Sequence, residues 1–242
     1  MRYAVLGDIH ANLEALHAVM AHIDGQEVDA CLCTGDVVGY GADPAACLEL
    51  VRDAGMRTVQ GNHDAMAATD DRPRDFNAWA EDAVLWTRRQ LVPEQRLWLG
   101  ELPLMARPEP DLLMTHGSPA EPERWHYLEL VILAREAFAS VDDRVCLLGH
   151  THRPWSYRMR GARVVGHHMG RIELDPAARY LVNPGSVGQP RDRNPQAAYA
   201  VYDTGTRLID LHRVVYDVER AMAKIRDAGL PGYLASRLSG GR

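Results

Sequence analysis

Five short polar segments of the chain carry residue types that bind metal ions. Each supplies a carboxylate, an amide or an imidazole, and each follows a short apolar run. None contains a cysteine, so we do not expect a structural zinc site held by thiolates. Mixed nitrogen and oxygen ligands suit manganese, iron, zinc or cobalt rather than calcium. The segments are Asp8-Ile9-His10, Gly35-Asp36, Gly61-Asn62-His63-Asp64, Thr115-His116-Gly117 and Gly149-His150-Thr151-His152.

The number of donors indicates two metal ions rather than one. A single ion takes roughly four to six ligands, whereas the segments offer seven candidates and His63. In Asp8-Ile9-His10 and His150-Thr151-His152, the i, i+2 spacing keeps both side chains on one side of an extended segment. Two ions roughly 3.5–4 Å apart would hold the attacking and departing oxygens of a phosphoryl transfer. A lone histidine after a strand is more often structural, but five such segments with one chemistry favour a common site.

The apolar runs before these segments predict strands whose ends carry the donors. Between the first two runs, apolar residues recur at helical spacing over residues 13–23. Asp43-Pro44 begins a second predicted helix, which Gly55 ends. Such alternation is typical of an α/β fold, in which sites lie at the carboxyl ends of the strands. The predicted strands cover residues 3–6, 30–33, 57–60, 112–114 and 145–148.

The rest of the chain has a different pattern of apolar and polar residues. Residues 76–101 are predicted to be helical, and short alternating runs between about 155 and 215 predict mostly antiparallel strands. A last helix is predicted from Asp217 to Gly229, and the tail, residues 239–242, is expected to be frayed. Because the chain has no low-complexity linker, we expect one domain over residues 1–242.

Composition excludes several classes of protein. The 242 residues are 46% apolar and 25% charged, as in globular chains, and their net charge is 27 − 33 = −6. This balance gives no general attraction for nucleic acid or anionic membranes, and no run approaches the roughly 18–20 apolar residues of a membrane span. We expect no signal peptide at the N-terminus, and the four cysteines form no CxxC pair. We therefore expect a cytoplasmic protein; homo-oligomerisation is left open.

The ordered segments GDIHAN, GDVVGYG, GNHD, THG and GHTH resemble the calcineurin-like metallophosphoesterase superfamily. The short insertions and residues 183–191 (NPGSVGQPR) are similar to its small bacterial and archaeal phosphodiesterase branch. The resemblance runs from residue 3 to about residue 215. It implies a four-layer αββα sandwich with two mixed β-sheets, which is an α/β fold (α+β by some schemes).

The resemblance also implies a role for each donor. The first metal ion would be held by Asp8, His10, Asp36 and His152, and the second by Asp36, Asn62, His116 and His150. Asp36 would bridge the two ions and so belong to the catalytic machinery. The implied cofactors are two divalent transition-metal ions per chain, manganese foremost, with iron, zinc, cobalt or nickel as alternatives. His63 would bind no metal; it would protonate the leaving oxygen or stabilise charge on the phosphoryl group.

The activity so implied is hydrolysis of a phosphate ester, foremost a phosphodiester. A hydroxide bridging the two metal ions would attack in line, while His63, at least partly protonated, assists the leaving group. The alternatives are a dinucleoside polyphosphate (Ap4A-type) hydrolase, a phosphomonoesterase and, more distantly, a non-catalytic interaction module on the same fold. The expected partner is a small phosphate ester or nucleotide. A nuclease is not expected, because the chain lacks a basic stripe.

Three further residues are candidates for binding substrate. Asn12 either hydrogen-bonds near the site or caps the following helix. Arg191 either binds a substrate phosphate through two N–H groups or is a solvated loop residue. Tyr40 could line the pocket. We also expect lids at residues 66–75, which include Arg72 and Arg74, and at residues 125–127.

Overall fold

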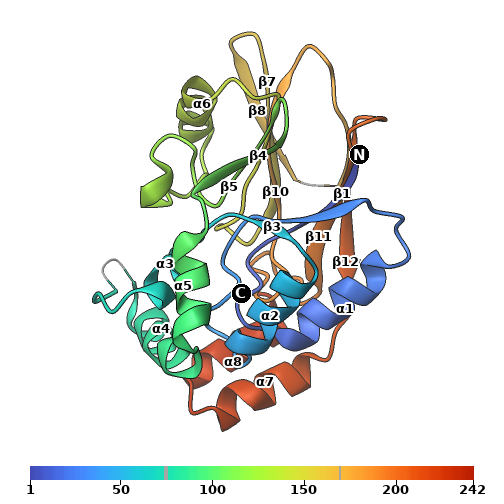
Figure 1. The fold of residues 1–242 in the computed structure, drawn as a ribbon. Helices are drawn as coiled ribbons and strands as arrows, with labels where there is room; N and C mark the ends of the chain where they lie inside the picture. The colour runs from blue at the N-terminus through green and yellow to red at the C-terminus, as the bar shows by residue number, and fades with distance from the viewer. Residues whose placement is uncertain (74–75, 169) are drawn as a thin grey trace.

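The computed structural model describes residues 1–73, 76–168 and 170–242. Arg74, part of one expected lid, therefore lies outside the described residues. Within these ranges the chain forms twelve strands and eight α-helices, with one 3-10 helix, η1 (Figure 1). In chain order the elements are β1 Arg2–Leu6, α1 Leu13–Ile23, β2 Ala30–Cys33, α2 Pro44–Asp53, β3 Arg57–Thr58, α3 Asn62–Ala68, α4 Ala78–Gln90, α5 Pro93–Glu101, β4 Met105–Glu109, β5 Leu112–Thr115, η1 Pro122–Arg124, α6 Val131–Ser140, β6 Val145–Leu147, β7 Pro154–Arg160, β8 Arg163–His168, β9 Arg171–Glu173, β10 Arg179–Pro184, β11 Ala197–Asp203, β12 Leu208–Val214, α7 Val218–Asp227 and α8 Gly232–Gly240.

The strands form two mixed sheets of six strands each. The first sheet has the order β3-β2-β1-β11-β12-β9, in which β1, β2 and β3 are parallel and the other pairs are antiparallel. The second has the order β4-β5-β6-β10-β7-β8, with β5, β6 and β10 parallel at its centre. The strands predicted between about residues 155 and 215 are mostly antiparallel, as expected, although β10 also pairs in parallel with β6.

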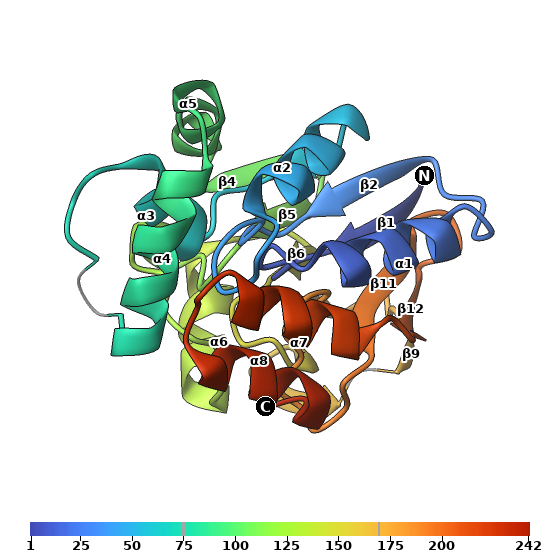
Figure 2. The same cartoon turned by 90° about the horizontal axis from the view of Figure 1, so that it is seen from below.

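Alternation of side chains along the strands builds four layers. On β1, Ala4 and Leu6 pack against α1, α2, α7 and α8, whereas Val5 joins the apolar cluster between the two sheets. On β6, Val145 belongs to that same cluster, and Cys146 packs on the α6 side. Figure 2 shows the helices that cover the first sheet. The αββα sandwich expected from the sequence is therefore confirmed.

The structure agrees with one helical prediction and corrects another. The helical region predicted over residues 76–101 forms two helices, α4 and α5, because Pro93 starts α5 at a position where its missing N–H costs nothing. The tail is not frayed, which corrects the expectation for residues 239–242. Leu234 and Leu238 are buried on one face of α8, and the Gly241 carbonyl accepts a hydrogen bond from the Arg193 N–H (2.8 Å).

All four cysteines are free thiols, and Cys33, Cys47 and Cys146 are buried. No helix in the described ranges has the length and apolar character that crossing a bilayer requires.

We predict that the second sheet depends on the packing of Leu113, which is fully buried beneath α6. Leu113→Ala should lower the free energy of unfolding in urea by about 2–5 kcal/mol, through lost burial and the cavity left behind. The control is Leu97→Ala on α5, because Leu97 is 61% exposed. Its effect should stay within about 0.5–1 kcal/mol. Equal losses in the two variants would contradict the layer assignment.

Candidate metal centre

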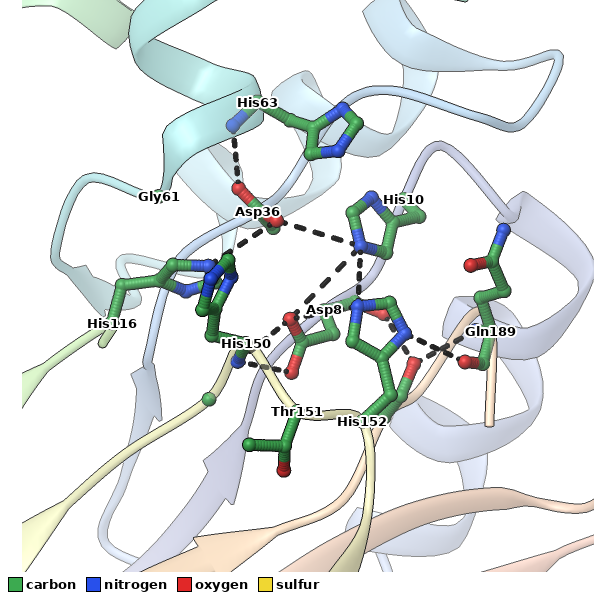
Figure 3. Close-up of polar contacts among 12 residues, drawn as sticks. Asp8, His10, Asp36, Gly61, His63, His116, His150, Thr151, His152 and Gln189 are labelled. Carbon is green, nitrogen blue, oxygen red and sulfur yellow. Dashed lines mark hydrogen bonds and ion pairs between the residues drawn. The ribbon is translucent and has the colours of Figure 1, made fainter. Parts of the chain in front are cut away.

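The predicted donors meet where strands of both sheets end. Asp8 follows β1 and Asp36 follows β2 in the first sheet, while His116 follows β5 and His150 follows β6 in the second. In each sheet the two strands are parallel, so their carboxyl ends lie at the same edge. Figure 3 shows these side chains pointing toward a common space, together with His10 and His152.

Ligand atoms gather in two groups that share Asp36. One atom each from Asp8, His10, Asp36 and His152 lies within 4.8 Å of the others, and the same holds for Asp36, His116 and His150. All of these side chains are buried. Asn62 begins α3 beside them, and its Oδ1 is buried without a hydrogen-bond partner in the described structure. We call the seven residues the ligand cluster: Asp8, His10, Asp36, Asn62, His116, His150 and His152.

Backbone carbonyls fix the orientation of three imidazoles. A carbonyl only accepts hydrogen bonds, so a ring nitrogen that contacts one must carry a proton. In a neutral ring the other nitrogen then presents its lone pair, as metal-bound histidines do. The contacts join Nδ1 of His10 to Val38 O (3.1 Å), Nδ1 of His116 to Thr34 O (2.8 Å) and Nδ1 of His152 to Gln189 O (2.7 Å).

The short contact between the Nε2 atoms of His10 and His152 is repulsive unless a cation binds both nitrogens. Their Nε2 atoms lie 3.1 Å apart, and both present lone pairs when Nδ1 holds the proton. Two nitrogens bound to one ion at about 2.1 Å, with a near-right angle between them, would be roughly 3 Å apart. Asp8 Oδ1 lies 3.4 Å from His152 Nε2. The first group therefore fits a divalent ion.

Asp36 is placed to serve both groups. Its Oδ1 accepts a hydrogen bond from the His63 backbone N–H (2.9 Å). Its Oδ2 has no hydrogen-bond partner in the described structure and lies 3.5 Å from His10 Nε2 and 3.3 Å from His116 Nε2. Burial alone would raise the pKa of Asp36, but His116 and His63 hold it well below its ordinary value. Asp36 is therefore a carboxylate that could bridge two ions.

The pKa of His116 shows that the Asp36 carboxylate stabilises a positive charge beside it. Burial opposes protonation, but Asp36 and Asp8 raise the pKa of His116 to about 9. Without a metal ion, a proton on Nε2 thus balances Asp36. A divalent ion would displace that proton.

The backbone of the ligand loops adopts an unusual conformation. Asp8, His10, Asp36, His150 and His152 all have φ between +48° and +70°. This corrects the expectation that the i, i+2 pairs lie on extended segments: left-handed turns bring the side chains together instead. Such residues cost roughly 1–3 kcal/mol each. Hydrogen bonds between loops hold them, including Asp8 N–H to Gly35 O (3.0 Å) and His10 N–H to Asp36 O (2.9 Å).

Gly61 and Asp64 join the start of α3 to the Asp36 loop. A Cβ on Gly61 would lie 2.1 Å from Asp36 Oδ1, so only glycine allows this approach. The Asp64 carboxylate accepts backbone N–H groups from Gly61 (3.1 Å), Asp36 (2.8 Å) and Val38 (3.2 Å). These bonds place Asn62 and His63 beside the ligand cluster.

His63 lies against the ligand cluster in an aromatic environment. It is only 3% exposed, and its ring centroid lies 4.3 Å from that of Tyr40 and 4.8 Å from that of Phe76. Burial lowers the pKa of His63 to about 4. The ring is thus neutral near neutral pH in the absence of substrate, whereas the sequence-based expectation was partial protonation. A neutral ring still donates one N–H.

The ligand cluster opens into a cavity of about 860 Å³. Tyr40 and Arg191 line it, as expected for substrate-binding residues, and so do Arg72, Trp125 and Tyr127 from the two expected lids. Asn12 does not line it. Its Oδ1 caps α1 by accepting the Ala15 N–H (3.1 Å), and its Nδ2 donates to Gly188 O (2.8 Å).

Sequence reasoning missed two contributors to this site. Gln189 lies in the NPGSVGQPR segment, and its carbonyl orients His152. Phe76 packs against His63 and lines the cavity. The NPGSVGQPR segment, which resembles the family, could have indicated Gln189 as a site residue, whereas no motif indicated Phe76.

Comparisons with known proteins point to one family. Residues 1–207 match the model of the calcineurin-like phosphoesterase superfamily domain. The uncharacterized protein MJ0912 of Methanocaldococcus jannaschii is 38% identical over 242 residues, which cover 99% of this chain and 98% of that protein. A metallophosphoesterase from Sphaerobacter thermophilus is 37% identical, with a TM-score of 0.88 and 100% of both chains covered. Protein PH1004 from Pyrococcus horikoshii OT3 shares the fold at 20% identity, with a TM-score of 0.83 and 100% of this chain and 98% of that chain covered.

We predict that Asp36→Asn weakens both metal positions at once, because one oxygen of Asp36 faces both ligand groups. The affinity for Mn²⁺ should fall by at least about tenfold at each position. Metal content after dialysis, measured by plasma mass spectrometry, checks this. Asp8→Asn is the matched control, since Asp8 belongs to the first group alone. Wild-type metal content and turnover in Asp36→Asn would rule out the bridging role.

Proposed function

This chain belongs to the calcineurin-like phosphoesterase superfamily, and from that premise we propose that it is a dinuclear phosphodiesterase acting on a small phosphate ester or nucleotide. The observation that carries the proposal is the pair of buried ligand groups that share Asp36. A non-catalytic module would have no need to bury two carboxylates among four imidazoles.

The free thiols agree with the cytoplasmic location that we propose for the protein.

Each metal position has its own set of side chains in the proposal. Asp8, His10, Asp36 and His152 hold the first ion, and Asp36, Asn62, His116 and His150 hold the second. Manganese is the first candidate, and iron, zinc, cobalt and nickel suit the same donors. When bound, such a pair of ions activates a water molecule and neutralises charge on the phosphoryl group.

His63 is proposed to act on the leaving oxygen. It lies beside Asp36 without being a member of either ligand group, and it lines the cavity. Its neutral ring can donate one hydrogen bond to the phosphoryl group. A phosphate anion bound beside the ring would raise the pKa of His63 from about 4 and so favour the proton that the leaving oxygen needs.

The size of the cavity favours a diester over a simple monoester. A volume of about 860 Å³ lies in the upper part of the range of small-molecule sites, which is roughly 300–1,000 Å³. It leaves room for organic groups on both sides of the phosphorus.

A metal-swap assay tests the proposed function. Protein freed of metal with EDTA is loaded with Mn, Fe, Co, Ni or Zn. It is then given bis(p-nitrophenyl) phosphate, p-nitrophenyl phosphate or diadenosine tetraphosphate. We expect metal-dependent hydrolysis, with a higher kcat/KM for the diester than for the monoester. A protein that binds two ions but hydrolyses none of these substrates would contradict the proposal and favour an interaction module.

We predict that His63→Ala keeps both metal ions but lowers kcat. Loss of general acid catalysis should cost about 10²–10⁴-fold on esters with poor leaving groups, such as alkyl or nucleoside esters. The loss should be much smaller on p-nitrophenyl esters, whose leaving group needs no proton. Steady-state kinetics on both ester types, with metal content as the control, checks this. An equal loss on both would count against proton donation.

A further inference from the structure

Arg191 places an unpaired positive charge in the cavity wall. Its guanidinium lines the cavity, and no carboxylate in the described parts of the chain lies within ion-pair distance of it. The two other arginines that line the cavity have carboxylate neighbours: Arg72 lies 3.5 Å from Glu81, and Arg124 lies 3.4 Å from Glu121. Arg191 is therefore the cavity arginine most ready to accept an incoming anion.

A neutral side chain holds this guanidinium in place. Gln189 Oε1 accepts hydrogen bonds from Arg191 Nε (3.3 Å) and Nη2 (2.8 Å), and Gln189 is only 2% exposed. The Arg191 N–H donates to His152 O (3.2 Å), and the Arg191 carbonyl accepts from Arg153 Nε (3.0 Å). Gln189 thus uses two of the five N–H donors of the guanidinium. This arginine is positioned and not a freely solvated loop residue.

The Tyr40 ring contacts both Arg191 and the ligand cluster. The Tyr40 ring centroid lies 5.7 Å from Arg191 Cζ, 4.7 Å from the His10 ring and 4.3 Å from the His63 ring. Arg191 itself forms no hydrogen bond or ion pair with the side chains of Asp36 or His63 in the described structure. The Tyr40 ring therefore contacts His10 and His63 on one side and the guanidinium of Arg191 on another.

Tyr127 supports the same placement from a different segment. Its ring stacks on His150, with 3.9 Å between centroids and 18° between planes. Tyr127 and Arg191 both line the cavity, so Tyr127 connects the cavity wall to the second ligand group as Tyr40 connects it to the first.

We propose that Arg191 binds a second phosphate group of the substrate, one unit along from the phosphate that is cleaved. The guanidinium fork matches phosphate oxygens, and the N–H donors that Gln189 does not use can meet them. The residue would thus select substrates in which two phosphates are linked over those with one. This inference rests on the proposed function, because it places the cleaved phosphate at the ligand cluster.

Calorimetry with two probes tests the inference without turnover. Mn²⁺-loaded protein is titrated with inorganic phosphate and with methylenediphosphonate, at the same free metal concentration. Arg191→Ala should weaken methylenediphosphonate binding by about tenfold or more, the loss expected for charge-assisted hydrogen bonds, and should affect phosphate far less. Equal weakening would place Arg191 on the cleaved phosphate and overturn the inference. Unchanged affinity for both probes would also overturn it.

Three further variants separate position from charge. Arg191→Lys keeps the charge but loses the fork, so an intermediate loss is expected. Gln189→Glu sets a carboxylate against the guanidinium and should weaken methylenediphosphonate binding although Arg191 is still present. Metal content is checked in that variant, because the Gln189 carbonyl orients His152. Arg163→Ala is the matched control: Arg163 is exposed on β8 and does not line the cavity, so no change is expected.

The two proposals fail in different ways. A wild-type protein that does not hydrolyse bis(p-nitrophenyl) phosphate with any metal contradicts the proposed function, whatever the calorimetry shows. Wild-type hydrolysis of that diester, together with equal effects of Arg191→Ala on the two probes, leaves the proposed function standing and removes the role of Arg191.

Discussion

Two buried carboxylates, Asp8 and Asp36, require positive charge between and around them. Burial raises the pKa of Asp8 to about 7, and the nearby charge of Asp36 adds to the rise, while His116 opposes it. Water cannot supply the missing solvation, because both side chains are almost completely buried. Cations are the remaining means of balancing such charges at low cost. The backbone contacts of His10, His116 and His152 all turn the Nε2 atoms toward the same space, so the surrounding structure is arranged for metal ions.

Bringing these groups together requires unfavourable backbone conformations, which contacts elsewhere in the fold stabilise. Left-handed backbone at five members of the ligand cluster is unfavourable, and it persists only because other loops hold it. Those loops come from strands of two sheets, whose shared apolar cluster fixes the sheets face to face. The His150 N–H, from the second sheet, donates to the Asp8 carboxylate in the first (3.0 and 3.1 Å). Packing between the sheets is thus what sets the spacing of the ligands.

The sequence predicts the strand ends well and picks out side chains that the fold brings together, because residue type and period 2 alternation are local properties. It does not predict the backbone at Asp8 and His10, since the carbonyls that hold their turns belong to Gly35 and Asp36, more than twenty residues away. The neutral state of His63 depends on burial by Tyr40 and Phe76, which meet it only after folding. Helix α8 was missed for the same reason: its small and polar residues form a helix because Leu234 and Leu238 find a buried site.

Gln189 connects the two ends of the proposed substrate site. Its backbone carbonyl accepts the Nδ1 proton of His152 and so fixes the nitrogen that faces the metal position. Its side chain, from the same residue, holds the guanidinium of Arg191. Ser186 strengthens this link, because its Oγ accepts the Gln189 N–H and donates to Asp8 O (both 2.8 Å). One short loop therefore sets the distance between the proposed metal ligand His152 and the proposed phosphate-binding residue Arg191, and a geometry shared in this way favours substrates whose charged groups have a fixed spacing.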